Sequence, residues 1–315
     1  MLQQRSAMIC EICHSDAWQP VADVPDVRYG RDDVCYHVVR CSNCYVMATM
    51  EGNVIVNPWS HYPEQYGAFT APVVTGKPRI PSRTRLPIFK HAITGRLSWL
   101  DHVSLEPNQR VLEVGCGTGR ISSYLKAALD WDMTGIEPNP EAAAIARDAG
   151  LNVYTGTLED YEGDGLFDIV ILIHVLEHLT NPAASMKAIN GLLKVGGKLV
   201  IAVPNAGSVE RKLFTRYWDG WDIPRHVYNF DPKSLAELLA RTGFAPSQAR
   251  FECYSLLGRS VANKFLGHLD YNVRKHRFQN RLLERVWGVF LAVIKCSSAI
   301  QIVAERKASP LKNKL

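Results

Sequence analysis

The sequence lacks the features that would place the chain in a membrane or on a secretory route. None of its apolar runs approaches the roughly 20 residues that a membrane-spanning helix needs. Residues 1–7 contain no apolar core of the kind that a secretory signal carries, so we expect a cytoplasmic protein. A formal net charge of +5 on 315 residues is too small to indicate a nucleic-acid-binding protein.

The composition is that of a globular protein, with 47% hydrophobic and 21% charged residues. The length allows one large domain and a smaller one. Eight cysteines are present, and in a cytoplasmic chain they are expected to be metal ligands or free thiols rather than disulfides.

Four of these cysteines form two C-x-x-C pairs, Cys10 with Cys13 and Cys41 with Cys44. Each pair can present two thiolates to one metal ion, and two pairs complete a tetrahedral zinc site. We therefore predict a structural zinc ribbon over residues 1–50, in which metal binding supplies part of the folding free energy. The alternative is that the two pairs are unrelated.

Residues 51–88 are rich in proline, glycine and aromatic residues and are predicted to be a linker or lid. Tyr62, Tyr66 and Phe69 lie close together in this stretch. They either pack between two domains or form a flap over a ligand, since aromatic faces suit adenine rings and cations. Residues 89–105 carry apolar side chains at helical spacing and are predicted to lead as a helix into the main domain.

Residues 110–120 read R-V-L-E-V-G-C-G-T-G-R, which predicts a buried strand, a glycine turn and the start of a helix. Glycine lets a ligand approach the backbone, and the helix start directs N–H groups toward it. A dinucleotide pyrophosphate would need G-x-G-x-x-G, but Arg120 stands where the third glycine belongs. Glu113 would repel a pyrophosphate and suits a ligand with an ammonium group. A tight turn without a ligand is the other alternative.

Strand and helix patterns alternate through the rest of the chain, which predicts a doubly wound, mainly parallel α/β sheet within a domain over residues 89–308. Glu137 ends the second strand, where a carboxylate can accept hydrogen bonds from ribose hydroxyls. Residues 309–315 are expected to be a tail. The further strands are expected at residues 133–137, 151–156, 167–173, 198–203, 251–257 and 300–305.

Two motifs resemble those of the class I S-adenosylmethionine-dependent methyltransferases of the type 11, 12 and 23 groups. They are the E-x-G-x-G-x-G signature that begins at Glu113 and the string H-V-L-E-H-L that begins at His174. The resemblance covers about residues 107–245 and implies a Rossmann-like seven-stranded sheet with an antiparallel last strand and S-adenosylmethionine as cofactor. The cofactor-binding residues that it implies, together with the glycine turn, are Glu113, Gly115, Cys116, Gly117, Gly119, Glu137, Pro138, Thr157, Leu158, Glu159 and His174.

The same string offers a second chemistry. Related quinone O-methyltransferases carry E-x-x-E-H at this place and use it to hold a divalent metal. In this sequence Glu177 and His178 match that pattern, whereas His174 replaces the first glutamate. A metal-assisted quinone or phenol O-methyltransferase is therefore an alternative.

Residues 205–230 form a loop rich in aromatic and charged residues, predicted at the carboxyl ends of the strands, where open α/β sheets bind ligands. A similar D-x-P-R-H-x-x-x-F string occurs in zinc-ribbon methyltransferases of polysaccharide and natural-product gene clusters. His226 is the predicted general base, and Arg225 is predicted to bind an anionic group of the substrate. Alternatively, both residues fix the loop. Trp218 and Trp221 either stack on the acceptor or belong to the core.

A helix is expected over residues 271–295, followed by a basic end. Residues 273–315 contain ten lysines and arginines and two acidic residues, next to an apolar run over 286–294. The helix either packs with a solvated basic face or contacts an anionic membrane surface at the inner face of the cell membrane.

The sequence therefore predicts an enzyme that methylates oxygen or carbon on a small-molecule, glycan-like or lipid-linked acceptor. A non-catalytic interaction protein, in which the zinc ribbon docks a partner, is the alternative from another class.

Overall fold

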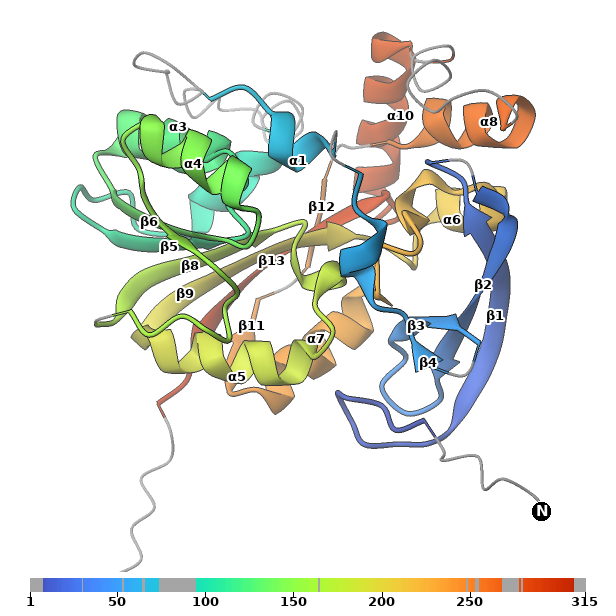
Figure 1. Ribbon diagram of the computed structural model, residues 1–315, viewed down its shortest axis with the longest axis horizontal. Coiled ribbons are helices and arrows are strands. Elements are labelled where there is room, and N and C mark those ends of the chain that lie inside the picture. Colours follow the sequence, from blue (N-terminus) through green and yellow to red (C-terminus); the bar gives the residue numbers. More distant parts are fainter. Residues whose placement is uncertain are drawn as a thin grey trace, which may run out of the picture.

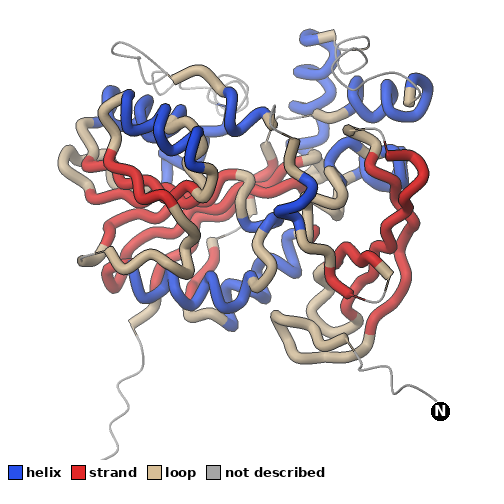
Figure 2. The backbone as a smooth tube through the Cα atoms, in the orientation of Figure 1, coloured by secondary structure: helices blue, strands red, loops and turns tan. Residues whose placement is uncertain are grey.

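The computed structural model describes residues 8–308 apart from 30, 53, 64–65, 74–94, 164, 248, 253–254, 268–277 and 279. These residues build a central sheet between two layers of helices and a smaller antiparallel sheet beside it (Figure 1). Figure 2 shows the strands of both sheets in red, with the smaller sheet on the right. The predicted tail and residues 53, 64–65 and 74–88 of the predicted linker lie outside the described residues.

The central sheet has the strand order β11-β13-β9-β8-β5-β6-β7, and the short β12 also pairs with β13. Its strands are β5 (Arg110–Val114), β6 (Asp132–Glu137), β7 (Asn152–Thr155), β8 (Phe167–Ile173), β9 (Leu193–Pro204), β11 (Phe244–Pro246), β12 (Arg250–Phe251) and β13 (Ala299–Arg306). β5 to β9 pair in parallel, whereas β13 is antiparallel to β9. The predicted doubly wound sheet with an antiparallel last strand is confirmed.

Helices cover both faces of this sheet, which is why its strands are apolar runs rather than alternating ones. Helices α3 (Arg120–Leu129) and α4 (Pro140–Asp148) lie on one face, and α5 (Pro182–Leu192) and α7 (Pro232–Arg241) lie on the other (Figure 1). α4, α5 and α7 each begin with a proline after a polar N-cap residue whose side chain accepts backbone N–H groups. The N-cap residues are Asn139, Asn181 and Asp231.

The other helices within the described residues are short or lie at the edge of the molecule. They are η1 (Pro58–His61), α1 (Gly67–Thr70), η2 (Gly95–His102), η3 (Leu176–His178), α6 (Val209–Phe214), η4 (Thr215–Tyr217), η5 (Asp219–Trp221), α8 (Leu257–Leu266) and α10 (Arg281–Val293). Among the residues described, no helix combines the length and the apolar composition that a membrane crossing requires.

Several element boundaries differ from the prediction. Two short strands, β11 and β12, take the place of the predicted sixth strand over residues 251–257. β12 ends at Phe251, and Leu257 begins the amphipathic helix α8. A short apolar run cannot be assigned to strand or helix by periodicity alone. β9 begins at Leu193 rather than at 198. Of the predicted helix over 89–105, the described part is the 3₁₀ helix η2; residues 89–94 lie outside the described residues.

The smaller sheet combines strands from the N-terminal part of the sequence with one short strand from the substrate loop. Its strands are β1 (Trp18–Asp26), β2 (Arg31–Cys41), β3 (Met47–Glu51), β4 (Val54–Ile55) and β10 (Tyr228–Asn229). β10 comes from the predicted substrate loop and pairs with β3, with Tyr228 opposite Ala48. One hydrophobic cluster runs from Cys10 through this sheet to Phe244. The N-terminal unit and the substrate loop therefore share one core.

A buried ion-pair group links the two sheets. Both terminal nitrogens of Arg225 donate to Asp26 at the end of β1, at 2.8 and 3.0 Å, and its Nε donates to Asp222 at 2.8 Å. All three side chains are at most 9% exposed. Burial alone would lower the pKa of Arg225, but the two carboxylates raise it, so the group stays charged. A buried pair of this kind is costly to break, because the remaining charge is left without its partner.

We predict that Asp26→Ala lowers the free energy of unfolding by about 3 kcal/mol, since it leaves Arg225 with half of its buried counter-charge. Asp23→Ala is the matched control on the same strand, because Asp23 pairs with His37 at the exposed surface. It should change stability by less than about 1 kcal/mol. Urea titration followed by circular dichroism measures both variants. Equal effects of the two substitutions would show that the buried pair does not hold the sheets together.

Candidate active site

The glycine turn lies between β5 and α3, at the carboxyl end of the central strand. Gly115, Gly117 and Gly119 all have positive φ angles, of 67°, 55° and 78°. A Cβ atom on Gly117 would lie 2.6 Å from the carbonyl oxygen of Ala68, so only glycine fits beneath the segment that crosses there. The predicted strand, turn and helix are all found.

Two buried carboxylates support this turn from neighbouring strands. Glu137, at the end of β6, accepts hydrogen bonds from the N–H groups of Gly117 (2.7 Å) and Asn139 (2.8 Å). Glu113, near the end of β5, accepts a hydrogen bond from the Ser122 hydroxyl on α3. Burial raises the pKa of Glu137, and it raises that of Glu113 to about 7, in spite of the hydrogen bonds to both groups. Both side chains would gain from a ligand that carries hydroxyl or ammonium donors.

The other predicted cofactor residues lie along the same edge of the sheet. Cys116 and Leu158 are buried, and Thr157 donates to Asp160 at 2.6 Å. Glu159 accepts from Ser185 on α5 at 2.8 Å. Pro138 separates Glu137 from the N-cap of α4. The strand order changes direction between β5 and β8, and doubly wound sheets bind ligands at the carboxyl ends of the strands at such a point.

The aromatic segment over residues 58–71 crosses the glycine turn. The hydroxyl of Thr118 donates to the carbonyl oxygen of Ala71 at 2.6 Å. The rings of Tyr62, Tyr66 and Phe69 pack on one another with centroids 5.0 to 5.9 Å apart. Tyr62 also packs on His178, with centroids 5.9 Å apart. The segment thus lies between the glycine turn and the histidines, the position that a flap would take.

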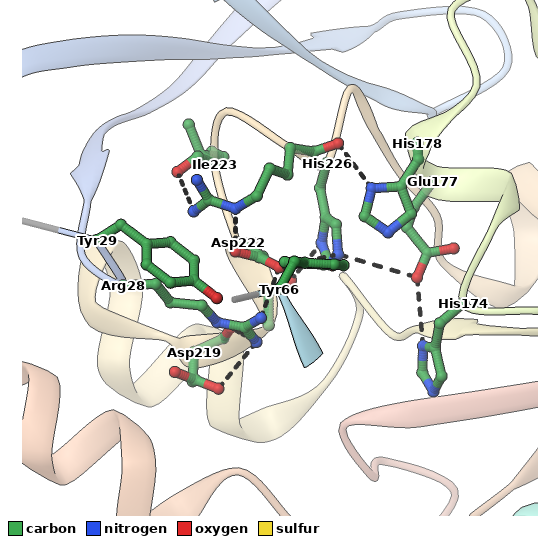
Figure 3. A network of polar contacts seen from close by, with 12 residues as sticks. Arg28, Tyr29, Tyr66, His174, Glu177, His178, Asp219, Asp222, Ile223 and His226 are labelled. Atoms are coloured by element: carbon green, nitrogen blue, oxygen red, sulfur yellow. Dashed lines mark hydrogen bonds and ion pairs between the residues drawn. The ribbon is translucent and has the colours of Figure 1, made fainter. Parts of the chain in front are cut away.

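Three histidines and one glutamate form a group beside that segment, in which Glu177 and His226 are buried and His174 and His178 are half-buried (Figure 3). Glu177 and His178 lie in η3, directly after β8, and His226 follows Arg225 in the substrate loop. Nδ1 of His174 lies 3.2 Å from Oε1 of Glu177, and Nε2 of His226 lies 3.9 Å from the same oxygen. Burial would raise the pKa of Glu177, but the hydrogen bond from His174 leaves it below the usual range.

The tautomers of two of these histidines follow from their neighbours. Nδ1 of His178 lies 2.9 Å from the carbonyl oxygen of Arg225, and Nδ1 of His226 lies 3.0 Å from that of Gly220. A carbonyl oxygen only accepts, so each Nδ1 carries the proton and each Nε2 keeps a lone pair. Burial lowers the pKa of His178 and that of His226, the latter to about 3, so both rings are neutral near pH 7.

This group has the chemistry of a metal site. One ligand atom from each of Glu177, His178 and His226 lies within 4.8 Å of the others. Oε2 of Glu177 is buried without a hydrogen-bond partner among the described residues. The Nδ1–H groups of both imidazoles are held by carbonyl oxygens, as is usual for histidines that bind metals through Nε2. Neutral imidazole and carboxylate ligands suit divalent transition metals.

The four N-terminal cysteines also come together. Sγ of Cys10 lies 3.6 Å from that of Cys44, and Sγ of Cys13 lies 3.4 Å from that of Cys41. All four Sγ atoms lie within 4.8 Å of one another. The cysteines are free thiols, and a tetrahedral site with zinc–sulfur bonds of about 2.3 Å needs sulfurs about 3.8 Å apart. The donor set fits zinc. Cys35 is exposed on β2 and takes no part.

Arg225 and the two tryptophans of the substrate loop are buried among protein groups. The five N–H groups of Arg225 donate to Asp26, Asp222 and the carbonyl oxygens of His61 and Ile223. None remains for a substrate anion. Trp218 and Trp221 are at most 1% exposed and stack edge to face, so their place is the core rather than the acceptor surface.

Several residues of this site carry no signal in the sequence. Arg28 donates to Asp219 and Asp222 at 3.0 and 2.5 Å, although nearly 200 residues separate them in the chain (Figure 3). The ion pairs with Arg225 and Arg28 outweigh burial and hold the pKa of Asp222 well below its usual range. Only the D-x-P-R-H string pointed to Asp222, and nothing pointed to Arg28 or Asp26.

Curated relatives of the chain are methyltransferases. A protein of Xanthomonas axonopodis pv. citri (strain 306) named ubiquinone biosynthesis O-methyltransferase is 38% identical over 117 residues, which cover 34% of this chain and 48% of that protein. A protein of the same name from Bordetella avium (strain 197N) is 30% identical over 202 residues, or 55% of this chain and 81% of that protein. The chain thus spans about half the length of the Xanthomonas relative and more of the Bordetella one.

A structural comparison agrees on the fold. A chain in the solved complex between the Haloferax volcanii Trm112 methyltransferase activator and a methyltransferase superposes with a TM-score of 0.50 at 17% identity. The match covers 70% of this chain and 89% of that one. The family model described as a methyltransferase domain matches residues 90–249, half of the chain. The chain therefore belongs to the methyltransferase domain family and has its Rossmann-like fold.

Proposed function

We propose that this chain is an S-adenosylmethionine-dependent methyltransferase that acts on a hydroxyl group of a small-molecule acceptor. The observation that carries the proposal is the meeting of the glycine turn, with its two carboxylates, and the histidine group under one aromatic segment. A sulfonium cofactor is already activated, so the protein has to align the acceptor and remove one proton. Oxygen is the proposed target because the curated relatives are named O-methyltransferases.

Each predicted cofactor residue has its own proposed role. Glu137 would accept the ribose hydroxyls, in addition to the N–H group of Gly117 that it already holds. Glu113 would favour the ammonium group of the cofactor, which in turn would lower the raised pKa of its carboxyl. Leu158 and Glu159 would contact the adenine, and His174 the transferring end. Thr157, Pro138 and Cys116 would shape the site.

His226 is the proposed general base. Its Nδ1–H group is fixed by Gly220, so Nε2 is free to take the proton of the acceptor hydroxyl. Arg225 is better assigned as a positioning residue than as a substrate ligand, because its N–H groups all serve protein acceptors. With a pKa of about 3, however, His226 is a weak base for a hydroxyl group.

That weakness favours a second candidate function, metal-assisted methylation of a phenol or quinol. Glu177, His178 and His226 would hold the divalent ion, and the unpartnered Oε2 of Glu177 supports this assignment. The ion would lower the pKa of the acceptor hydroxyl, so that a weak base suffices. In this case His226 is a metal ligand and not the base.

We also propose that Cys10, Cys13, Cys41 and Cys44 hold a structural zinc ion. The first two thiols lie in the loop before β1 and the other two at and just after the end of β2, and these places meet at the open end of the β1–β2 hairpin. Four thiolates leave no open coordination position, so this ion would serve folding and not catalysis.

Binding of S-adenosylmethionine tests the main proposal. Calorimetry should show binding by the wild type, and Glu137→Ala should weaken it roughly tenfold or more, because a charged acceptor of two hydrogen bonds is lost. Glu141→Ala is the matched control, because Glu141 is exposed on the first turn of α4. No binding by the wild type would favour the non-catalytic interaction protein, and tighter binding of NAD would favour a dinucleotide enzyme.

His226→Ala tests whether His226 takes part in the reaction, as a base or as a metal ligand. We expect kcat for methylation of a catechol probe to fall by roughly 10²–10⁴-fold while the Kd for S-adenosylmethionine stays unchanged, since His226 acts on the acceptor. His37→Ala, at an exposed histidine on β2, should have no effect. An unchanged kcat would remove His226 from the reaction.

The wild type is also measured after EDTA treatment, with and without added Mn²⁺. Full activity without metal supports His226 as the base. Activity that depends on Mn²⁺ and is lost in Glu177→Gln supports the metal-assisted function instead.

Cys44→Ser should remove the zinc. Elemental analysis should find one zinc ion per chain in the wild type and in Cys35→Ser, and less than one in Cys44→Ser. Thermal unfolding of Cys44→Ser should begin at a lower temperature, because metal binding contributes to folding. A wild-type protein that folds without any bound metal would refute the zinc ribbon.

A further inference from the structure

α8 and α10 carry many of the exposed apolar side chains in the described part of the chain. In α10, Leu282, Val286 and Val293 are 71%, 61% and 64% exposed and recur at helical spacing, so they share one face. Further large apolar residues with high exposure lie on or next to the two helices, namely Phe265, Phe278, Leu283, Phe290 and Ile294. Together, these eight residues are half of the large apolar residues that are exposed in the described part of the chain. We call this set the α8–α10 face.

The opposite side of α10 is firmly packed. Leu291 is fully buried, and Nε1 of Trp287 donates to the buried carboxylate of Glu210 at 3.1 Å. Glu284 accepts a hydrogen bond from the N–H group of Gly258, at the start of α8. α10 is therefore apolar on both sides, and only one side is used within the described residues. An exposed apolar face of this size on an ordered helix indicates an external partner.

The charges around the α8–α10 face indicate which partner. Residues 264–295 contain seven lysines and arginines and two acidic residues, Asp270 and Glu284. Glu284 is half-buried and accepts a hydrogen bond from the N–H group of Gly258. Lys264 and Lys295 are exposed at the far ends of α8 and α10. A second copy of this chain would bring like charges together, whereas an anionic lipid surface complements both the charge and the apolar residues.

We propose that the α8–α10 face docks on an anionic lipid bilayer, with α10 lying in the interface and its apolar side chains among the acyl chains. The proposal is independent of the reaction, but it bears on the acceptor. Two hydrogen bonds join α8 to Asp219 in the substrate loop. The hydroxyl of Ser260 accepts from the backbone N–H group of Asp219, and the side-chain amide of Asn263 donates to the Asp219 carboxylate at 3.2 Å. Asp219 in turn holds Arg28 in the buried ion-pair group. Docking would place the acceptor side of the site next to the membrane, which suits a lipid-linked acceptor.

Vesicle binding tests the proposal with a matched pair of variants. The full chain is floated with vesicles of phosphatidylcholine and phosphatidylglycerol, and with vesicles of phosphatidylcholine alone. Val286→Asp/Val293→Asp changes the α8–α10 face. Val54→Asp/Val195→Asp makes the same change at two valines that are each 64% exposed elsewhere on the molecule. Because all four positions are exposed, both variants should fold, and their thermal unfolding is compared with that of the wild type.

The wild type should bind the anionic vesicles, and higher salt should weaken that binding. Val286→Asp/Val293→Asp should reduce it roughly tenfold or more, because apolar burial is lost and negative charge is added. Val54→Asp/Val195→Asp should bind like the wild type. The proposal is overturned if the wild type ignores anionic vesicles or if both variants bind equally. It is also overturned if the wild type is a dimer in solution that Val286→Asp/Val293→Asp converts to a monomer.

Discussion

The guanidinium group of Arg225 is the point on which the arrangement of the site depends. It pairs with Asp26 from the N-terminal sheet and Asp222 from the substrate loop, and it also donates to the carbonyl oxygen of His61 in the aromatic segment. Three separate parts of the chain therefore meet at one buried cation. Burial of such a charge is tolerable because every N–H group has an acceptor. The next residue is His226, so the same contacts set where its ring lies against Glu177.

The aromatic segment joins the two halves of the proposed reaction. At one end, Ala71 and Ala68 contact the glycine turn that would hold the cofactor. At the other end, Oη of Tyr62 lies 2.8 Å from Nδ1 of His178. A ligand under this segment would be shielded from water, and proton transfer would then depend on the neutral histidines rather than on solvent.

The sequence predicted the parts of the molecule that repeat a pattern. β5, the glycine turn and β8 lie where apolar runs and alternating glycines place them, and the C-x-x-C pairs meet because their spacing allows it. Arg28 and Asp26 were missed, since their partners are nearly 200 residues away and ion pairs over that distance leave no local pattern. The positions of Trp218 and Trp221 were ambiguous in the sequence. An aromatic residue in a loop can face the acceptor or the core, and only the packing around it decides.

A crystal structure with S-adenosylhomocysteine tests the central claim most directly. The account predicts both ribose hydroxyls within about 2.7–3.2 Å of the Glu137 carboxylate, the amino-acid end over the glycine turn, and the sulfur directed toward His174 and His226. The aromatic segment should lie over the ligand. A ligand bound away from the glycine turn, or with its sulfur directed away from the histidine group, would contradict the assignment of this site to methyl transfer.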